Sequence, residues 1–164
     1  MTDKACSFCS EDIRASAFAE TANLVAIYNI APIVPGHTLI IPRRHLQRIA
    51  DLSDDEFCQF WIFARTVTNF ILDTFRTRAF DWTIQEQVEA GQTVPHLHLH
   101  IIPRVAKDFP EPGDWYPRLR HGRIVEHARE VIDSNDRVKL TIEQRKEIAA
   151  ELATRWTKWN ATSI

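Results

Sequence analysis

The chain has 164 residues, of which 45% are hydrophobic and 26% charged, and its formal net charge is −2. This composition indicates a globular protein, and the length predicts a single domain, residues 1–164, with a core of its own. The small net charge argues against a broad basic surface for nucleic acid or an anionic membrane, and no apolar run is long enough to cross a bilayer. The N-terminus lacks the apolar stretch of a secretory signal, so we expect a cytoplasmic protein.

The three cysteines are an odd number, which argues against a disulfide scaffold in a chain with no export signal. Cys6 and Cys9 form a Cys-x-x-Cys pair, which suits either a metal site or a redox motif. A redox pair would begin a helix after a strand, and no strand is predicted before Cys6, so we favour metal binding. Cys58 falls inside an apolar helical pattern, and we expect it to be a small buried side chain.

Three β-prone segments, residues 17–20, 24–28 and 38–42, are predicted to be strands. Pro32, Pro35 and Gly36 lie between the second and the third, and they predict a rigid loop. His37 lies where this loop enters the third strand, a position at which a scaffold often holds site residues. Taken alone, this segment is equally compatible with a surface loop histidine.

A long helix is predicted to follow Ser53. Ser53 and Glu56 have the spacing of a capping box, which marks a helix N-terminus. Apolar residues then recur at steps of three and four: Phe57, Phe60, Ala64, Val67 and Ile71. This stripe is typical of a helix that packs on a core.

Residues 79–104 are predicted to form a β-hairpin. In its first strand Phe80, Trp82 and Ile84 alternate with polar residues, and Gln85 on the polar face could look toward the second strand. The second strand alternates three histidines, His96, His98 and His100, with Leu97, Leu99 and Ile101. Each buried imidazole needs hydrogen-bond partners, so three in a row are a poor choice for stability and indicate a functional site on this strand.

The last third of the chain gives weaker signals. Residues 105–139 are rich in proline and aromatic residues, and we favour a solvated face over phosphate binding for Arg118, Arg120 and Arg123. A closing helix is predicted over residues 141–159, with a second capping box at Thr141 and Gln144. Its apolar stripe would pack on the domain or on a partner subunit, and its two tryptophans slightly favour the partner: Ile148, Leu152, Trp156 and Trp159.

The pattern from His96 to Ile102 resembles the signature of the histidine triad (HIT) family of nucleotide hydrolases and transferases. The resemblance covers about residues 5–117. Gly91-Gln92-Thr93-Val94, Pro103-Arg104 and Tyr116 are most similar to the fragile-histidine-triad branch, which cleaves diadenosine polyphosphates. The resemblance implies an α+β fold with a five-stranded antiparallel sheet, a long helix, a C-terminal helix in an extension beyond the core, and a homodimer.

The same resemblance implies roles for individual residues. His98 would attack the α-phosphate of a dinucleoside polyphosphate and form a nucleotidyl-histidine intermediate, from which water releases AMP. The predicted donors to the phosphate are His100, Gln92 and Thr93, with His37 completing the set and His96 as the first member of the catalytic triad. Asn29 would contact the ribose, and Gln85 the leaving or attacking oxygen. No metal is required for this chemistry.

A zinc site is implied by the similarity of the cysteine pair to zinc-bearing bacterial and Hint-like relatives. In those relatives two histidines complete the ligand set, and the corresponding residues here give four ligands of the types that zinc prefers: Cys6, Cys9, His45 and His96. We expect structural zinc at this site, in which case His96 is structural and only His98 and His100 face the phosphate. Two free thiols beside a solvated His45 are the alternative.

Other functions are compatible with the same residues. The three histidines of the triad could themselves hold a catalytic metal, since His-x-His pairs on strands can do so. Within the family, a nucleoside phosphoramidase or a dinucleoside polyphosphate phosphorylase would use the same nucleophile. A non-enzymatic protein that binds an adenine nucleotide is the remaining alternative.

Overall fold

The computed structural model describes residues 6–111 and 139–162. Its centre is a five-stranded antiparallel sheet with the strand order β1-β2-β3-β5-β4. The strands are β1 (Ala17–Glu20), β2 (Leu24–Tyr28), β3 (Thr38–Pro42), β4 (Ala79–Ile84) and β5 (Leu99–Arg104). The predicted α+β fold and the number of strands are therefore confirmed, whereas Tyr116 and the three arginines at 118, 120 and 123 lie outside the described residues.

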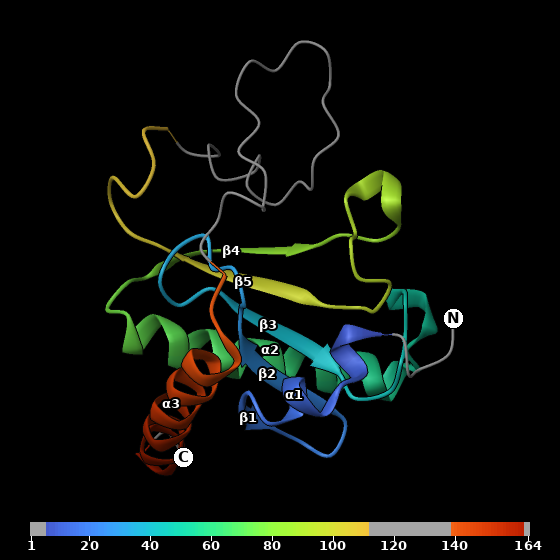
Figure 1. Cartoon of the computed structure of the whole chain (residues 1–164), viewed down its shortest axis with the longest axis horizontal. Coiled ribbons are helices and arrows are strands. Elements are labelled where there is room, and N and C mark those ends of the chain that lie inside the picture. Colours follow the sequence, from blue (N-terminus) through green and yellow to red (C-terminus); the bar gives the residue numbers. More distant parts are fainter. Residues whose placement is uncertain (1–5, 112–138, 163–164) are drawn as a thin grey trace.

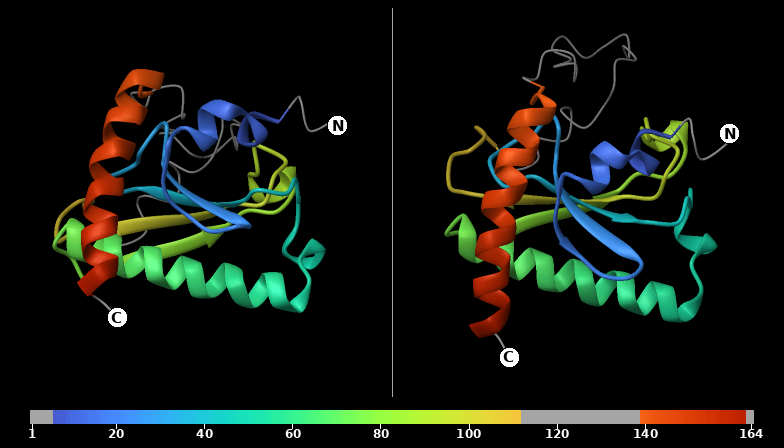
Figure 2. Two further views of the ribbon diagram at one scale, coloured as in Figure 1. Left: turned by 90° about the horizontal axis from the view of Figure 1, so that it is seen from below. Right: turned by 60° about the horizontal axis from the view of Figure 1, so that its bottom comes forward.

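Helices cover both faces of the sheet (Figures 1 and 2). The long helix α2 (Asp54–Thr74) runs across one face, and the short helix α1 (Glu11–Arg14) lies on the opposite face beside a 3-10 turn, Ser7–Cys9. The C-terminal helix α3 (Ile142–Thr162) crosses the end of the sheet next to β1, and its first turns reach the face that carries α1. None of the described helices is long and apolar enough to span a membrane.

The two faces of the sheet build separate cores. On the central strands, Ala26, Ile40 and Leu99 join the large core under α2 and α3, whereas Ile27 and Leu39 pack with Ile13 of α1 on the other face. This division follows from the alternation of side chains along a strand. Because the core under α1 is small, that face leaves room for a site.

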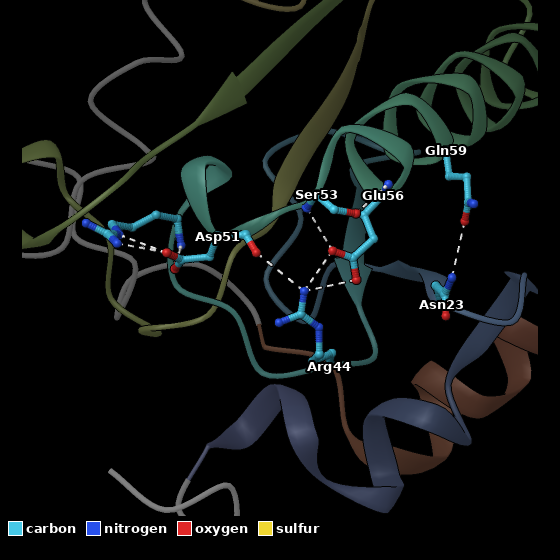
Figure 3. A network of polar contacts seen from close by, with 7 residues as sticks. Asn23, Arg44, Asp51, Ser53, Glu56 and Gln59 are labelled. Atoms are coloured by element: carbon cyan, nitrogen blue, oxygen red, sulfur yellow. Dashed lines mark hydrogen bonds and ion pairs between the residues drawn. The ribbon is translucent and has the colours of Figure 1, made fainter.

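Helix α2 begins as the sequence predicts. The Ser53 hydroxyl accepts a hydrogen bond from the Glu56 N–H, and the Glu56 carboxylate accepts one from the Ser53 N–H (Figure 3). Two predictions for its stripe are wrong. Cys58 is exposed. It precedes the buried Phe60 by two residues, a rotation of about 200° around the helix, and so faces the opposite side. Phe57 lies at the edge of the stripe and remains 40% exposed.

Helix α3 packs on its own domain through its tryptophans. Trp156 and Trp159 contact Phe70 of α2 edge-to-face, with ring centroids 5.3 and 5.8 Å apart. The Trp159 indole N–H also donates a hydrogen bond to Asp73 at 2.7 Å. The predicted capping box at the start of α3 is present, with reciprocal bonds between Thr141 and Gln144.

Candidate active site

The histidine stretch is not one continuous strand. The chain bends at residues 94–96, and β5 begins only at Leu99, so the predicted strand starts three residues too early. The alternation of burial still holds, because Leu97, Leu99 and Ile101 are fully buried in the core under α2. The bend turns His96 toward the N-terminal cysteines, away from the other two histidines.

His98 is held as a neutral base. Its Nδ1–H donates a hydrogen bond to the backbone carbonyl of His96 at 2.7 Å, which leaves the lone pair on Nε2. The ring is only 5% exposed. This burial lowers the pKa of His98 below its usual value, while the bond to the His96 carbonyl partly opposes the shift. An unprotonated Nε2 in such a position is a competent nucleophile.

His37 and His100 form a hydrogen-bonded pair beside His98. The N–H of Ile33 donates to His37 Nδ1 at 3.2 Å, so the proton of this imidazole is on Nε2. That atom lies 2.8 Å from His100 Nδ1, which therefore accepts, and the His100 proton is placed on Nε2. The pair thus fixes His100 as a hydrogen-bond donor from its far nitrogen.

Asn29 is positioned by the same loop. Its side-chain oxygen accepts a hydrogen bond from the Ala31 N–H at 2.8 Å, which turns its NH₂ group toward His37 Nε2 at 3.2 Å. The single proton on His37 Nε2 is donated to His100, at the shorter distance. We therefore treat the approach of the Asn29 NH₂ group to the same nitrogen as a van der Waals contact. Asn29 also lines the cavity described next.

A cavity of about 400 Å³ lies on the α1 face of the sheet. His98 and His100 line it together with Asn29, Gln85 and Thr93, which brings five of the predicted site residues to one place. Its apolar wall comes from α1, β2 and β3, through Ile13, Ile27 and Leu39. Neutral donors at one end and aliphatic side chains beside them suit a ligand with a phosphate and a flat, weakly polar ring.

Gln92 does not line this cavity. Its side-chain oxygen accepts from the Gln87 N–H at 3.0 Å, and its NH₂ group lies 3.4 Å from the carbonyl oxygens of Gln47 and His96. These contacts connect the loop before β5 to its surroundings. The predicted contact between Gln92 and a phosphate therefore stays a prediction, and the hydrogen bonds favour a role in holding the loop.

Gln85 reaches the cavity across a glycine. Its NH₂ group donates to the Ala90 carbonyl at 2.9 Å, and Gly91 follows with a φ of +91°. A β-carbon on Gly91 would lie 2.7 Å from Gln85 Nε2. Only glycine fits here, because both the left-handed backbone and the close approach of Gln85 exclude a side chain.

A second cluster combines the two cysteines with two histidines. The possible ligand atoms of Cys6, Cys9, His45 and His96 all lie within 4.8 Å of one another. His96 donates its Nε2–H to the Pro42 carbonyl at 2.8 Å, so its Nδ1 lone pair faces Cys6 Sγ at 3.4 Å and Cys9 Sγ at 3.6 Å. His45 Nδ1 lies 3.4 Å from Cys9 Sγ.

These separations fit a metal ion. Zn–S bonds of about 2.3 Å and Zn–N bonds of about 2.0 Å in a tetrahedron place sulfur and nitrogen about 3.5 Å apart. His96 also makes the contact to a carbonyl that a ligating histidine usually makes with its other nitrogen. His45 lacks that feature, since its Nε2 is buried with no hydrogen-bond partner among the described residues. Arg44, next to it, pairs with Glu56 at 2.7 Å and anchors this segment to α2 (Figure 3).

Two contacts join this cysteine–histidine cluster to the cavity. The first is the His96 carbonyl, which accepts the hydrogen bond from the His98 ring. The second is Phe8, between the two cysteines, whose ring lies edge-on to His98 with centroids 5.0 Å apart and lines the cavity. The cluster therefore helps to orient the His98 ring, although His96 itself does not line the cavity.

The two basic residues that line the cavity were not predicted as site residues. Lys139 and Arg145 belong to the C-terminal segment, outside the stretch that resembles a known family, and both line the cavity. One signal could have identified Arg145: it lies in phase with the apolar stripe of α3, three residues before Ile148 and seven before Leu152. A charged residue on an otherwise apolar stripe faces the interior, where it needs a partner.

Comparison with known proteins agrees with this geometry. Residues 10–107 match the HIT domain. A bis(5'-adenosyl)-triphosphatase of Dictyostelium discoideum is 32% identical over 135 residues, 82% of this chain and 91% of the relative. An asymmetrical bis(5'-nucleosyl)-tetraphosphatase of Schizosaccharomyces pombe is 40% identical over 107 residues, 65% of this chain and 59% of the relative.

A solved structure has the same fold. The Plasmodium falciparum diadenosine triphosphate hydrolase in complex with cyclomarin A aligns with a TM-score of 0.65 and 24% identity, over 88% of this chain and 78% of that chain. The domain match spans more than half of the sequence and includes all three histidines of the triad. The chain therefore belongs to the HIT family.

Proposed function

We propose that this protein hydrolyses dinucleoside polyphosphates at the α-phosphate and releases a nucleoside monophosphate, AMP with an adenine substrate. The observation that carries the proposal is the neutral His98 ring, which is fixed by the His96 carbonyl at 2.7 Å and lines a cavity. The curated relatives above are named for this class of reaction, which supports the proposal.

The reaction proceeds in two displacements. His98 Nε2 attacks the α-phosphorus, and the bond from that phosphorus to the bridging oxygen breaks, so the second nucleotide leaves with that oxygen. Water then attacks the same phosphorus, the P–N bond breaks, and the imidazole is regenerated as AMP departs. The Nδ1–H bond to the His96 carbonyl stabilises the positive charge that the ring carries in the intermediate.

Neutral donors stabilise the charge that develops on phosphate oxygens. His100 presents an N–H because His37 occupies its other nitrogen, and the hydroxyl of Thr93 lines the same wall. Gln85 is available to the leaving or attacking oxygen, and Asn29 to the ribose. The aliphatic wall of Ile27 and Leu39 suits the base.

The cysteine–histidine cluster is proposed to hold a structural zinc ion through Cys6, Cys9, His45 and His96. Bound zinc would supply cross-links between the N-terminal segment, the segment after β3 and the bend before β5, and no step of the reaction needs it. We therefore expect purified protein to contain about one zinc per chain.

A homodimer and a cytoplasmic location remain proposals from the sequence. Two features support the dimer. Strand β4 is at the edge of the sheet, and apolar side chains are exposed on β4 and α2: Phe80 is 42%, Phe57 40% and Ile62 56% exposed. Sedimentation velocity of the purified protein would measure the mass in solution, and a monomer at micromolar concentration would contradict the dimer.

The test of the function is a turnover assay. Purified protein is incubated with diadenosine triphosphate, diadenosine tetraphosphate and adenosine 5'-phosphoramidate, and AMP release is followed by chromatography, with His98→Ala as the control. AMP release from the polyphosphates that the variant lacks supports the proposal. Faster release from the phosphoramidate would favour a phosphoramidase, and rapid loss of activity with a chelator would favour a catalytic metal.

A further inference from the structure

Arg145 is a buried cation with no counterion among the residues that the structure describes. Its side chain belongs to a residue that is 8% exposed, and its Nε atom makes no hydrogen bond. No carboxylate among residues 6–111 and 139–162 forms an ion pair with it. A guanidinium stays charged in a protein, and burying it without an anion is costly, so this site provides a place for an anion that the described residues do not supply.

The start of α3 is fixed against the site. The N–H of Leu140 donates to the Ile30 carbonyl at 2.8 Å, which ties the segment before α3 to the loop that follows β2. The adjacent residue of that loop is Asn29, and the adjacent residue of the C-terminal segment is Lys139. Figure 2 shows the first turns of α3 on the α1 side of the sheet. Lys139 and Arg145 therefore enter the cavity wall from outside the matched domain.

The described residues of the cavity wall carry more positive than negative charge, which favours an anionic ligand. Lys139 and Arg145 are the basic side chains of this described wall, and Asp12, which is exposed, is its acidic one. The groups placed to meet the α-phosphate, His98, His100 and Thr93, are neutral. Neutral donors can serve any substrate with one α-phosphate, whereas two further cations suit a ligand with additional phosphate groups.

We propose that Arg145, assisted by Lys139, binds the phosphate chain of the leaving nucleotide and makes the site selective for polyphosphate over phosphoramidate substrates. This inference rests on the proposed function. Arg145 is a binding residue here, and its interaction is lost when the leaving group has no phosphate.

The experiment compares Arg145→Met and Arg145→Lys with Arg155→Met, which removes an exposed arginine of the same helix paired with Glu151. For diadenosine triphosphate, we expect Arg145→Met to lower kcat/KM about 10- to 100-fold, the range of a charge-assisted hydrogen bond. For adenosine 5'-phosphoramidate, kcat/KM of Arg145→Met should change less than about 3-fold. With diadenosine triphosphate, Arg145→Lys should recover part of the lost kcat/KM. Arg155→Met should have the kcat/KM of wild type with both substrates.

A second measurement does not depend on turnover. Calorimetric binding of ADP and AMP to wild type and to Arg145→Lys gives the contribution of the second phosphate, and we expect the preference for ADP to fall in the variant. The proposal would be overturned if Arg145→Met lost kcat/KM equally for diadenosine triphosphate and the phosphoramidate. It would also be overturned if a folded Arg145→Met kept the wild-type kcat/KM for diadenosine triphosphate. If wild type cleaves none of the substrates, the proposed function fails, while an ADP preference that depends on Arg145 would still support an anion site.

Discussion

His96 and His100 are both buried and only four residues apart, but they belong to regions that use the imidazole differently. In the proposed catalytic region (His37, His98 and His100), ring nitrogens bond to one another or to a carbonyl, and a cavity lies beside them. In the cysteine–histidine cluster, one nitrogen of His96 bonds to a carbonyl and the other faces two sulfur atoms. The neighbours of a histidine, and not its place in a motif, determine what it can do.

The two regions are close enough to influence each other. The His96 backbone belongs to the cluster and accepts the hydrogen bond that fixes the tautomer of His98. A substitution can therefore separate catalysis from metal binding only if it leaves the His96 backbone carbonyl in place. Side-chain substitutions do so, and they can test whether the two regions act independently.

The largest effect is expected for His98→Asn. This variant removes the proposed nucleophile and retains a polar side chain of similar shape, so kcat should fall at least about 1,000-fold while substrate still binds. Zinc content and the melting temperature should stay close to wild type, because the side chain of His98 is not part of the cluster. Single-turnover kinetics and metal analysis measure the two properties, and loss of zinc in this variant would contradict the separation.

Cys9→Ser should have the opposite profile. Loss of one ligand should abolish zinc binding and lower the melting temperature by about 5–10 °C, equivalent to about 2–3 kcal/mol for a domain of this size. Turnover at low temperature should be reduced but not abolished. Cys58→Ser is the matched control, since Cys58 is exposed on α2 and should change neither property. Similar melting temperatures for both variants would argue that the cluster binds no structural metal.

Local signals in the sequence predicted most of the fold. The capping boxes at Ser53 and Thr141 located the starts of two helices, and alternation located the strands, because these patterns depend on neighbours in the chain. The same alternation wrongly extended the last strand to His96. The chain bends before β5, and the cysteines opposite the bend come from a segment about 90 residues earlier, which no local pattern reports.

The site residues were predicted from the family resemblance, so the prediction reached only the part of the chain that the resemblance covers, about residues 5–117. His98, His100, Asn29, Gln85 and Thr93 meet at one cavity, whereas Gln92 bonds within its loop. Arg145 was missed because α3 reaches the cavity through tertiary packing. The carbonyl that fixes His98 could not be named either, since the backbone carries no sequence signal.

His37→Ala should have an intermediate effect on the catalytic region alone. His37 acts through His100, so we expect kcat to fall about 10- to 100-fold, less than the loss for a direct phosphate donor, with zinc content unchanged. The double variant with His100→Ala should be no slower than His100→Ala alone, because both changes disable the same donor. Additive losses in this double-mutant cycle would show that His37 contacts the substrate independently.

The smallest effect is expected at Phe8. This residue lies between the two cysteines of the cluster in the sequence, and its side chain lines the cavity. Its edge-on contact with His98 has ring centroids 5.0 Å apart, and such a contact contributes about 0.5–1.5 kcal/mol. Phe8→Leu retains an apolar side chain but not the ring, so kcat/KM should fall about 2- to 10-fold while zinc stays bound. A larger loss accompanied by zinc release would show that Phe8 orders the cysteine loop, and the two regions would then be one cooperative unit.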